Sequence, residues 1–221
     1  MHTPMTLSRW LSVGAICLLL TTGCSTGADS DQSGVSAEQV CDSSLDKTAA
    51  AALRRLGGTD RFEELTGTTD AGEPNAFSLK RAAQHLHDET PLRSRCTVYK
   101  AGDKSGSPLI QIDFKVADDY PKRQQNSTQN NDRIYYDIGL YASTQGDYST
   151  VIYFRCSTTD QGKSSAYVDA GMFTTSTHLK GRSTSVDRMT ILNTVSRKLA
   201  AELGCSSEAG LPSSIPKPEA P

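Results

Sequence analysis

The spacing of hydrophobic residues changes along this chain, from a helical period to an alternating one and back. Residues 45–56, 79–86 and 189–203 each place their apolar side chains on one helical face. Glycine follows the first and third of these segments, as it commonly does where a helix ends. The pattern therefore predicts helices towards both ends of the chain.

Between these helices the hydrophobic pattern alternates, which is typical of half-buried strands. The clearest strand is 110–116, where the apolar residues Ile110, Ile112, Phe114 and Val116 alternate with Gln111, Asp113 and Lys115. Further strands are predicted at 95–100, 133–143, 149–157 and 165–174. Turn-rich segments separate neighbouring strands, so we expect an antiparallel meander of about five strands. The predicted fold class is α+β, with N-terminal and C-terminal helices packed on one face of the sheet.

The N-terminal segment, residues 1–23, has the parts of an export signal. Arg9 precedes a short apolar stretch, and the small residues of "TTG" come directly before Cys24. The apolar stretch is shorter than the ~20 residues that span a bilayer. A small residue followed by cysteine resembles the lipobox of bacterial lipoproteins, although Thr21 stands where an apolar residue is usual. This resemblance implies that Cys24 carries a diacylglyceryl group and anchors the protein to the outer side of the membrane.

Composition divides the rest of the chain into three parts. Residues 24–37 are small and polar, which is typical of a flexible tether. Residues 38–205 contain all the predicted helices and strands and form a single domain. Residues 206–221 are rich in proline and serine and are predicted to be a disordered tail.

Four cysteines in the predicted domain, Cys41, Cys96, Cys156 and Cys205, indicate two disulfides in an exported chain. Cys96 and Cys156 share strand faces with apolar residues, whereas the other two flank the first and last helices. This placement favours helix-to-strand bridges, Cys41–Cys96 with Cys156–Cys205. The pairing of Cys41 with Cys205 and of Cys96 with Cys156 remains the alternative.

The cysteine positions carry a second resemblance. A cysteine before an Ala-rich helix, the strand "RCTVY" and the closing "KLAAELGC" resemble small secreted lipoproteins of actinobacteria. This resemblance extends over most of the predicted domain, and it implies a disulfide-bonded domain without assigned active residues.

Charge and motifs narrow the possible partners. The net charge is −2 and no run of Lys or Arg occurs, which argues against nucleic acid as a partner. No glycine-rich phosphate loop, calcium loop or set of ligands at metal-site spacing is present, so we expect no cofactor and no metal. The expected partners are the membrane, through the anchor, and a cell-envelope polymer or protein.

One motif supports an alternative function. Ser44 and Lys47 have the S-x-x-K spacing of penicillin-binding proteins, in which the lysine assists deprotonation of the serine. The companion motifs of such enzymes are missing, and a helix N-cap explains Ser44 equally well. A cell-envelope hydrolase or acyl-transfer enzyme is therefore the alternative, and no catalysis is the main prediction.

The strand alternation also predicts which side chains point away from the core. They are mainly tyrosines and carboxylates: Tyr135, Asp137, Tyr141, Tyr153, Tyr167 and Asp169. Tyrosine suits contact with sugars or proteins because it combines a flat apolar ring with a hydroxyl. Tyrosine also favours strands without any binding role. The sequence thus predicts a binding or structural module whose candidate surface is the sheet face opposite the helices.

Overall fold

The computed structural model describes residues 34–219 apart from 71, 90–93, 124–131 and 181–183. The strands in this part are β1 (Phe62–Glu64), β2 (Cys96–Lys100), β3 (Ile110–Ala117), β4 (Arg133–Tyr136), β5 (Tyr141–Gln145), β6 (Ser149–Asp160) and β7 (Lys163–Thr174). The helices are α1 (Val40–Ser43), α2 (Lys47–Gly57), α3 (Leu79–Gln84) and α4 (Ser185–Glu202), with a short 3₁₀ helix at Ser176–His178.

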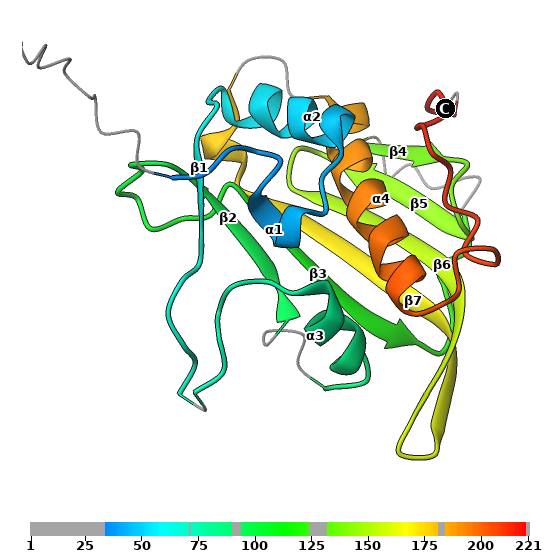
Figure 1. Ribbon diagram of the computed structural model, residues 1–221. Helices are drawn as coiled ribbons and strands as arrows, with labels where there is room; N and C mark the ends of the chain where they lie inside the picture. The colour runs from blue at the N-terminus through cyan, green and yellow to red at the C-terminus, as the bar shows by residue number, and fades with distance from the viewer. Residues whose placement is uncertain (1–33, 71, 90–93, 124–131, 181–183, 220–221) are drawn as a thin grey trace, which may run out of the picture. The chain divides into compact units, whose positions relative to one another are not determined.

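The seven strands form one antiparallel sheet in the order β1-β2-β3-β7-β6-β5-β4. Helices α1 to α4 lie along one side of this sheet (Figure 1). The α+β class and the single helical layer confirm the prediction from sequence. On the helical side of β3, Ile110, Ile112 and Phe114 are buried, whereas Lys115 on the other side is exposed.

The sheet differs from the predicted meander of about five strands in three ways. β1 is too short to produce a readable alternation. The predicted strand 133–143 is two strands, because the chain reverses at Gly139, which has a φ of 58°. The connection from β3 to β4 crosses to the far edge, so β7 pairs with β3 and joins two smaller meanders.

Side-chain caps explain where the two longest helices begin. Asp46 is the N-cap of α2 and accepts hydrogen bonds from the backbone N–H groups of Thr48 and Ala49, both at 2.9 Å. This differs from the sequence interpretation that made Ser44 the cap. At α4, Thr184 and Asp187 form a reciprocal capping box.

The core lies between the sheet and the helices. Helix α4 is its central element, with Met189, Leu192, Val195 and Leu199 buried, and it packs against both α2 and β6. Fully burying one such side chain contributes about 1.5–3 kcal/mol. Among the described residues, no helix is both long enough and apolar enough to cross a membrane.

Residues on both sides of the predicted domain pack onto it. The predicted tether reaches residue 37, but Val35 pairs with Phe62 and Ala37 is fully buried. The predicted tail, 206–221, lacks helices and strands in its described part, yet it packs onto the domain. Ala209 is buried, and the carbonyl of Pro212 accepts a hydrogen bond from Asn193 at 2.9 Å. Proline prevents regular structure but does not prevent packing.

Candidate functional site

We call the sheet face opposite the helices the outer face. Strand register places four polar side chains in one row across it: Lys115 on β3, Asp169 on β7, Tyr153 on β6 and Tyr141 on β5. Directly paired residues of antiparallel strands point to the same side of the sheet. The row is therefore continuous across the four strands.

Asp169 is the centre of this row. Its carboxylate accepts a hydrogen bond from the Tyr153 hydroxyl at 2.9 Å and lies 3.4 Å from the Lys115 ammonium group. Burial raises the pKa of the Tyr153 hydroxyl, and the negative charge of Asp169 raises it further. Tyr153 therefore stays protonated and acts as a hydrogen-bond donor.

A second ion pair lies one row away on the same face. Arg95 contacts the Asp113 carboxylate at 2.9 Å. The pKa of Asp113 lies above its ordinary value, because burial raises it more than the charge of Arg95 lowers it. Gly171 faces Asp113, and a Cβ atom at this glycine would lie 3.1 Å from the carboxylate. The missing side chain thus leaves room for the pair.

Tyrosine rings extend the surface towards the β4 edge. Tyr141 makes edge-to-face contacts with Tyr135 and Tyr153, with ring centroids 5.9 and 6.0 Å apart. Arg133 donates a hydrogen bond to the Tyr141 hydroxyl at 2.8 Å. The hydroxyls of Tyr141 and Tyr153 and the carboxylate of Asp169 therefore each have a hydrogen-bond partner within the protein.

The connection between β3 and β4 also contacts the outer face. Tyr120 packs on Tyr167, with ring centroids 5.3 Å apart, and the guanidinium of Arg123 lies 5.6 Å from the Tyr135 ring. Arg123 also pairs with Glu219 of the C-terminal segment. The sequence interpretation missed Tyr120 and Arg123 because their segment has no period that predicts its course.

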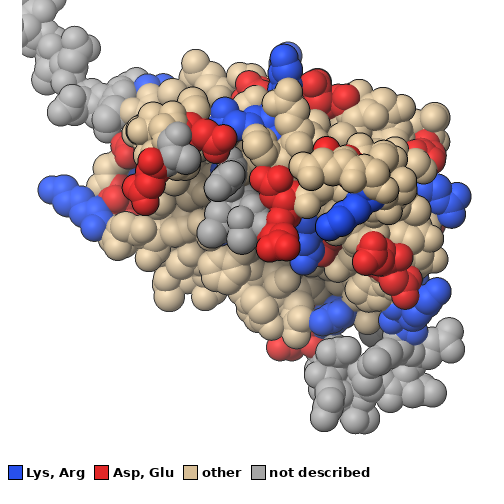
Figure 2. Space-filling view, turned by 90° about the horizontal axis from the view of Figure 1, so that it is seen from below, with Lys and Arg blue, Asp and Glu red and all other residues tan. Residues whose placement is uncertain are grey.

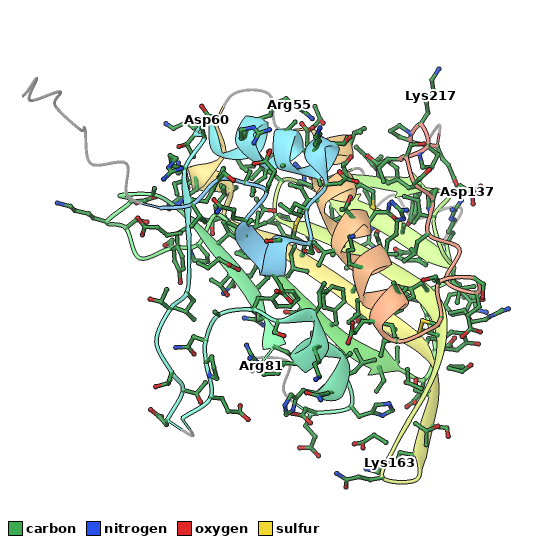
Figure 3. The ribbon with its side chains drawn as sticks, in the orientation of Figure 1. Arg55, Asp60, Arg81, Asp137, Lys163 and Lys217 are labelled. Carbon is green, nitrogen blue, oxygen red and sulfur yellow. A yellow bond between two sulfur atoms is a disulfide. The ribbon has the colours of Figure 1, made fainter. Side chains whose placement is uncertain are left out.

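The structure places most of the predicted surface residues together. Tyr135, Tyr153 and Tyr167 are half-buried on the outer face, whereas Tyr141 and Asp169 keep only 2% and 9% of their surface exposed. Asp137 does not belong to this face. It is exposed in the turn between β4 and β5, beside the rim of the sheet (Figure 3).

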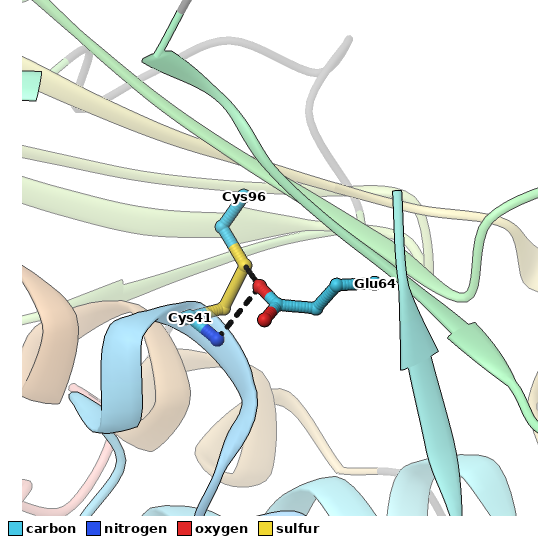
Figure 4. A group of neighbouring side chains, drawn as sticks. All are labelled: Cys41, Glu64 and Cys96. Atoms are coloured by element: carbon cyan, nitrogen blue, oxygen red, sulfur yellow. Dashed lines mark hydrogen bonds between the residues drawn. A yellow bond between two sulfur atoms is a disulfide. The ribbon is translucent and has the colours of Figure 1, made fainter. Parts of the chain in front are cut away.

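Both predicted disulfides are confirmed, with Cα–Cα distances of 5.4 Å for Cys41–Cys96 and 5.3 Å for Cys156–Cys205. Such bridges are typical of proteins outside the cytoplasm. Glu64 lies against the first bridge, where one carboxylate oxygen accepts the Cys41 N–H at 2.9 Å and lies 3.4 Å from the Cys96 sulfur (Figure 4). No motif in the sequence pointed to Glu64.

The remaining predicted residues do not form a site in the described part of the chain. Ser44 is buried, and its Oγ has no hydrogen-bond partner there, whereas Lys47 is exposed. No hydrogen bond joins these two described residues, so the geometry adds nothing to the S-x-x-K interpretation. Cys24 lies outside the described residues.

Charge on the surface is mixed. Figure 2, which views the molecule from below the orientation of Figure 1, shows basic and acidic side chains interspersed among uncharged ones. Comparison of the chain with known protein families, curated proteins and solved structures finds no match. Function therefore has to be inferred from the chemistry of the surfaces described above.

Proposed function

We propose that this protein is a binding module anchored by lipid at the outer side of the membrane, with its outer face as the contact surface. The observation that carries the proposal is the set of accessible side chains that lie together on the outer face around the nearly buried Tyr141 and Asp169: Lys115, Tyr135, Tyr153 and Tyr167. The two disulfides fit a location outside the cytoplasm.

The expected partner is a polymer or protein of the cell envelope. Half-buried Tyr135 and Tyr167 offer ring faces for a sugar or an apolar side chain, and Lys115 and Arg133 offer hydrogen-bond donors. Hydrogen bonds hold Arg133, an ion pair holds Lys115 and ring contacts hold Tyr135 and Tyr167, so little side-chain entropy is lost on binding. Rigid aromatic side chains with fixed polar neighbours are characteristic of interface centres.

Replacing Tyr135, Tyr153 and Tyr167 together by Ser tests the contact surface. We expect binding to isolated envelope polymers or proteins, measured by co-sedimentation and pull-down, to weaken by about tenfold or more. Tyr148→Ser is the matched control, because Tyr148 is 45% exposed in the turn between β5 and β6. Unchanged binding by a folded triple variant, or an equal loss in the control, would exclude the outer face.

The anchor requires its own test. Cys24→Ala should abolish incorporation of a labelled fatty acid and release the protein from the membrane fraction, because stable anchoring depends on the acyl chains. A variant that is still labelled would show that Cys24 is not the acylated residue.

A further inference from the structure

A hollow of about 460 Å³ lies where the N-terminal segment meets the sheet edge. Val35, Phe62 and Ala76 supply apolar parts of its wall, while Gln39, Glu63 and Glu64 supply polar groups. Its volume falls in the range of about 300–1,000 Å³ that is usual for small-molecule sites. The hollow is separate from the outer face described above. Its lining residues belong to the segment before α1, to the edge strand β1 and to the connection that follows β1.

Glu64 is the unusual member of this lining. Its carboxylate accepts the Cys41 N–H, but none of the ion pairs between described residues includes it. Among the described residues, no Lys or Arg lines the hollow. Burial raises the pKa of Glu64, and the nearby charge of Asp42 raises it further.

Even a half-buried carboxylate without a cation costs free energy, which a positively charged ligand would offset. Glu63 also contributes to the lining, but it precedes Glu64 directly in β1, so the two side chains point to opposite sides of the sheet, and Glu63 accepts the backbone N–H of Gly102 at 3.1 Å. The second Glu64 oxygen, Oε2, makes neither of these contacts, because the Cys41 N–H and the Cys96 sulfur both lie against Oε1 (Figure 4). The apolar wall supplies the remaining contact surface.

We propose that this hollow binds a small primary amine in its ammonium form, with Glu64 as the counter-ion and the apolar body of the amine against Val35 and Ala76. The site is independent of the outer face. Cys41 takes part only through its backbone N–H, which fixes the direction of the Glu64 carboxylate.

Benzylamine is a suitable probe, because it joins an ammonium group to a compact apolar ring. Titration of the full chain in detergent, followed by calorimetry, should give saturable binding that Glu64→Gln weakens by about tenfold, the scale of one charge-assisted hydrogen bond. Glu63→Gln is the matched control and should change the affinity less than about twofold. Benzyl alcohol, which lacks the charge, should bind the wild type and the Glu64→Gln variant equally.

A second variant keeps the test informative if Glu64→Gln perturbs the fold. Ala76→Phe leaves the carboxylate in place and fills the hollow, so it should abolish binding of both probes. The proposal is overturned if benzylamine does not bind the wild type, if Glu64→Gln binds it as well as the wild type, or if Glu63→Gln causes the same loss. Binding that survives Ala76→Phe would place benzylamine elsewhere on the protein.

Discussion

The two disulfides connect the same kinds of element, yet their surroundings differ. Each joins a segment flanking a helix to a strand of the sheet, across sequence separations of 55 and 49 residues. Each also has a glutamate beside it, Glu64 at the first bridge and Glu208 at the second. The linkage is therefore equivalent, and the differences lie in the backbone and in the exposure of the carboxylate.

At the first bridge the backbone is in an unfavourable conformation. Cys41, Asp42 and Ser43 have φ values of 53°, 58° and 53°, in the left-handed region that residues with a side chain rarely adopt. At the second bridge the left-handed residue is Gly204, for which this conformation costs little. Backbone strain of this kind often lies at functional sites, and here it adjoins the hollow that contains Glu64.

The two glutamates beside the bridges also differ, in how far each carboxylate is exposed to solvent. Glu64 is half-buried and accepts a hydrogen bond from the Cys41 N–H of the strained turn. Glu208 is exposed and accepts the backbone N–H of Ser157 at 3.0 Å. The second bridge is therefore a structural cross-link, whereas the first combines a cross-link with a strained turn and a half-buried carboxylate.

Removing either disulfide should change the free energy of unfolding more than any other substitution considered for the two bridges. The chain-entropy model assigns about 4 kcal/mol to either loop, so Cys41→Ala/Cys96→Ala and Cys156→Ala/Cys205→Ala should lose similar stability from this source. Relief of the strained turn should make the loss smaller for the first pair. Urea unfolding measures both losses. A clearly larger loss for the first pair would contradict the assignment of strain to residues 41–43.

Relaxing the turn should have an intermediate effect. Ser43→Gly should raise the free energy of unfolding by about 1 kcal/mol, because glycine adopts the left-handed conformation without a Cβ penalty. Ser206→Gly is the matched change beside the second bridge. Ser206 does not have a positive φ, so glycine there should lower stability slightly. Equal changes in the two variants would remove the distinction between the bridges.

The charge at Glu64 should have the smallest effect, visible as a dependence on pH. Burial raises the folded-state pKa of Glu64 above its unfolded value, so its contribution to stability is complete at low pH and is lost as pH rises through the folded pKa. Glu64→Gln lacks this loss and should gain stability relative to wild type between pH 4 and neutral pH, roughly the window in which carboxyl groups titrate.

Thermal unfolding of the wild type and of Glu64→Gln across this pH range measures the gain in stability. The groups that face the Glu64 carboxyl are Asp42 and the Cys41 N–H. Glu208→Gln is the comparison at the second bridge, where water solvates the carboxylate. Parallel curves for wild type and Glu64→Gln would show that the carboxylate near the first bridge is no more costly than an exposed one.

The hydrophobic period of the sequence was sufficient to predict those helices and strands that bury one regular face. Helices α2 and α4 and strand β3 agree with their predicted segments, and the phase of Cys96 and Cys156 led to the correct pairing. The outward direction of Tyr153 and Asp169 followed from the same alternation. Local patterns carry this information because each residue's direction depends on its neighbours in the chain.

Features that depend on distant contacts could not be predicted in this way. β1 is strand-like because it pairs with β2, and the crossover from β3 to β4 has no period. The C-terminal segment packs through Ala209 and backbone carbonyls, which its proline-rich composition concealed. The role of Glu64 depends on a fold that brings β1 beside Cys41, 23 positions earlier.

The position of β7 in the sheet determines when the protein can fold. β7 is the last strand in the chain, yet it lies in the interior of the sheet and pairs with β3 from Ile110 opposite Thr174 to Ala117 opposite Tyr167. A chain that emerges from its N-terminus can assemble β1–β2–β3 and oxidise Cys41 with Cys96 early, because all these residues precede β4. The sheet stays in two pieces until residue 174 is available, since this pairing is highly non-local. The bridge to Cys205 forms last, so the order of oxidation follows the order of the chain.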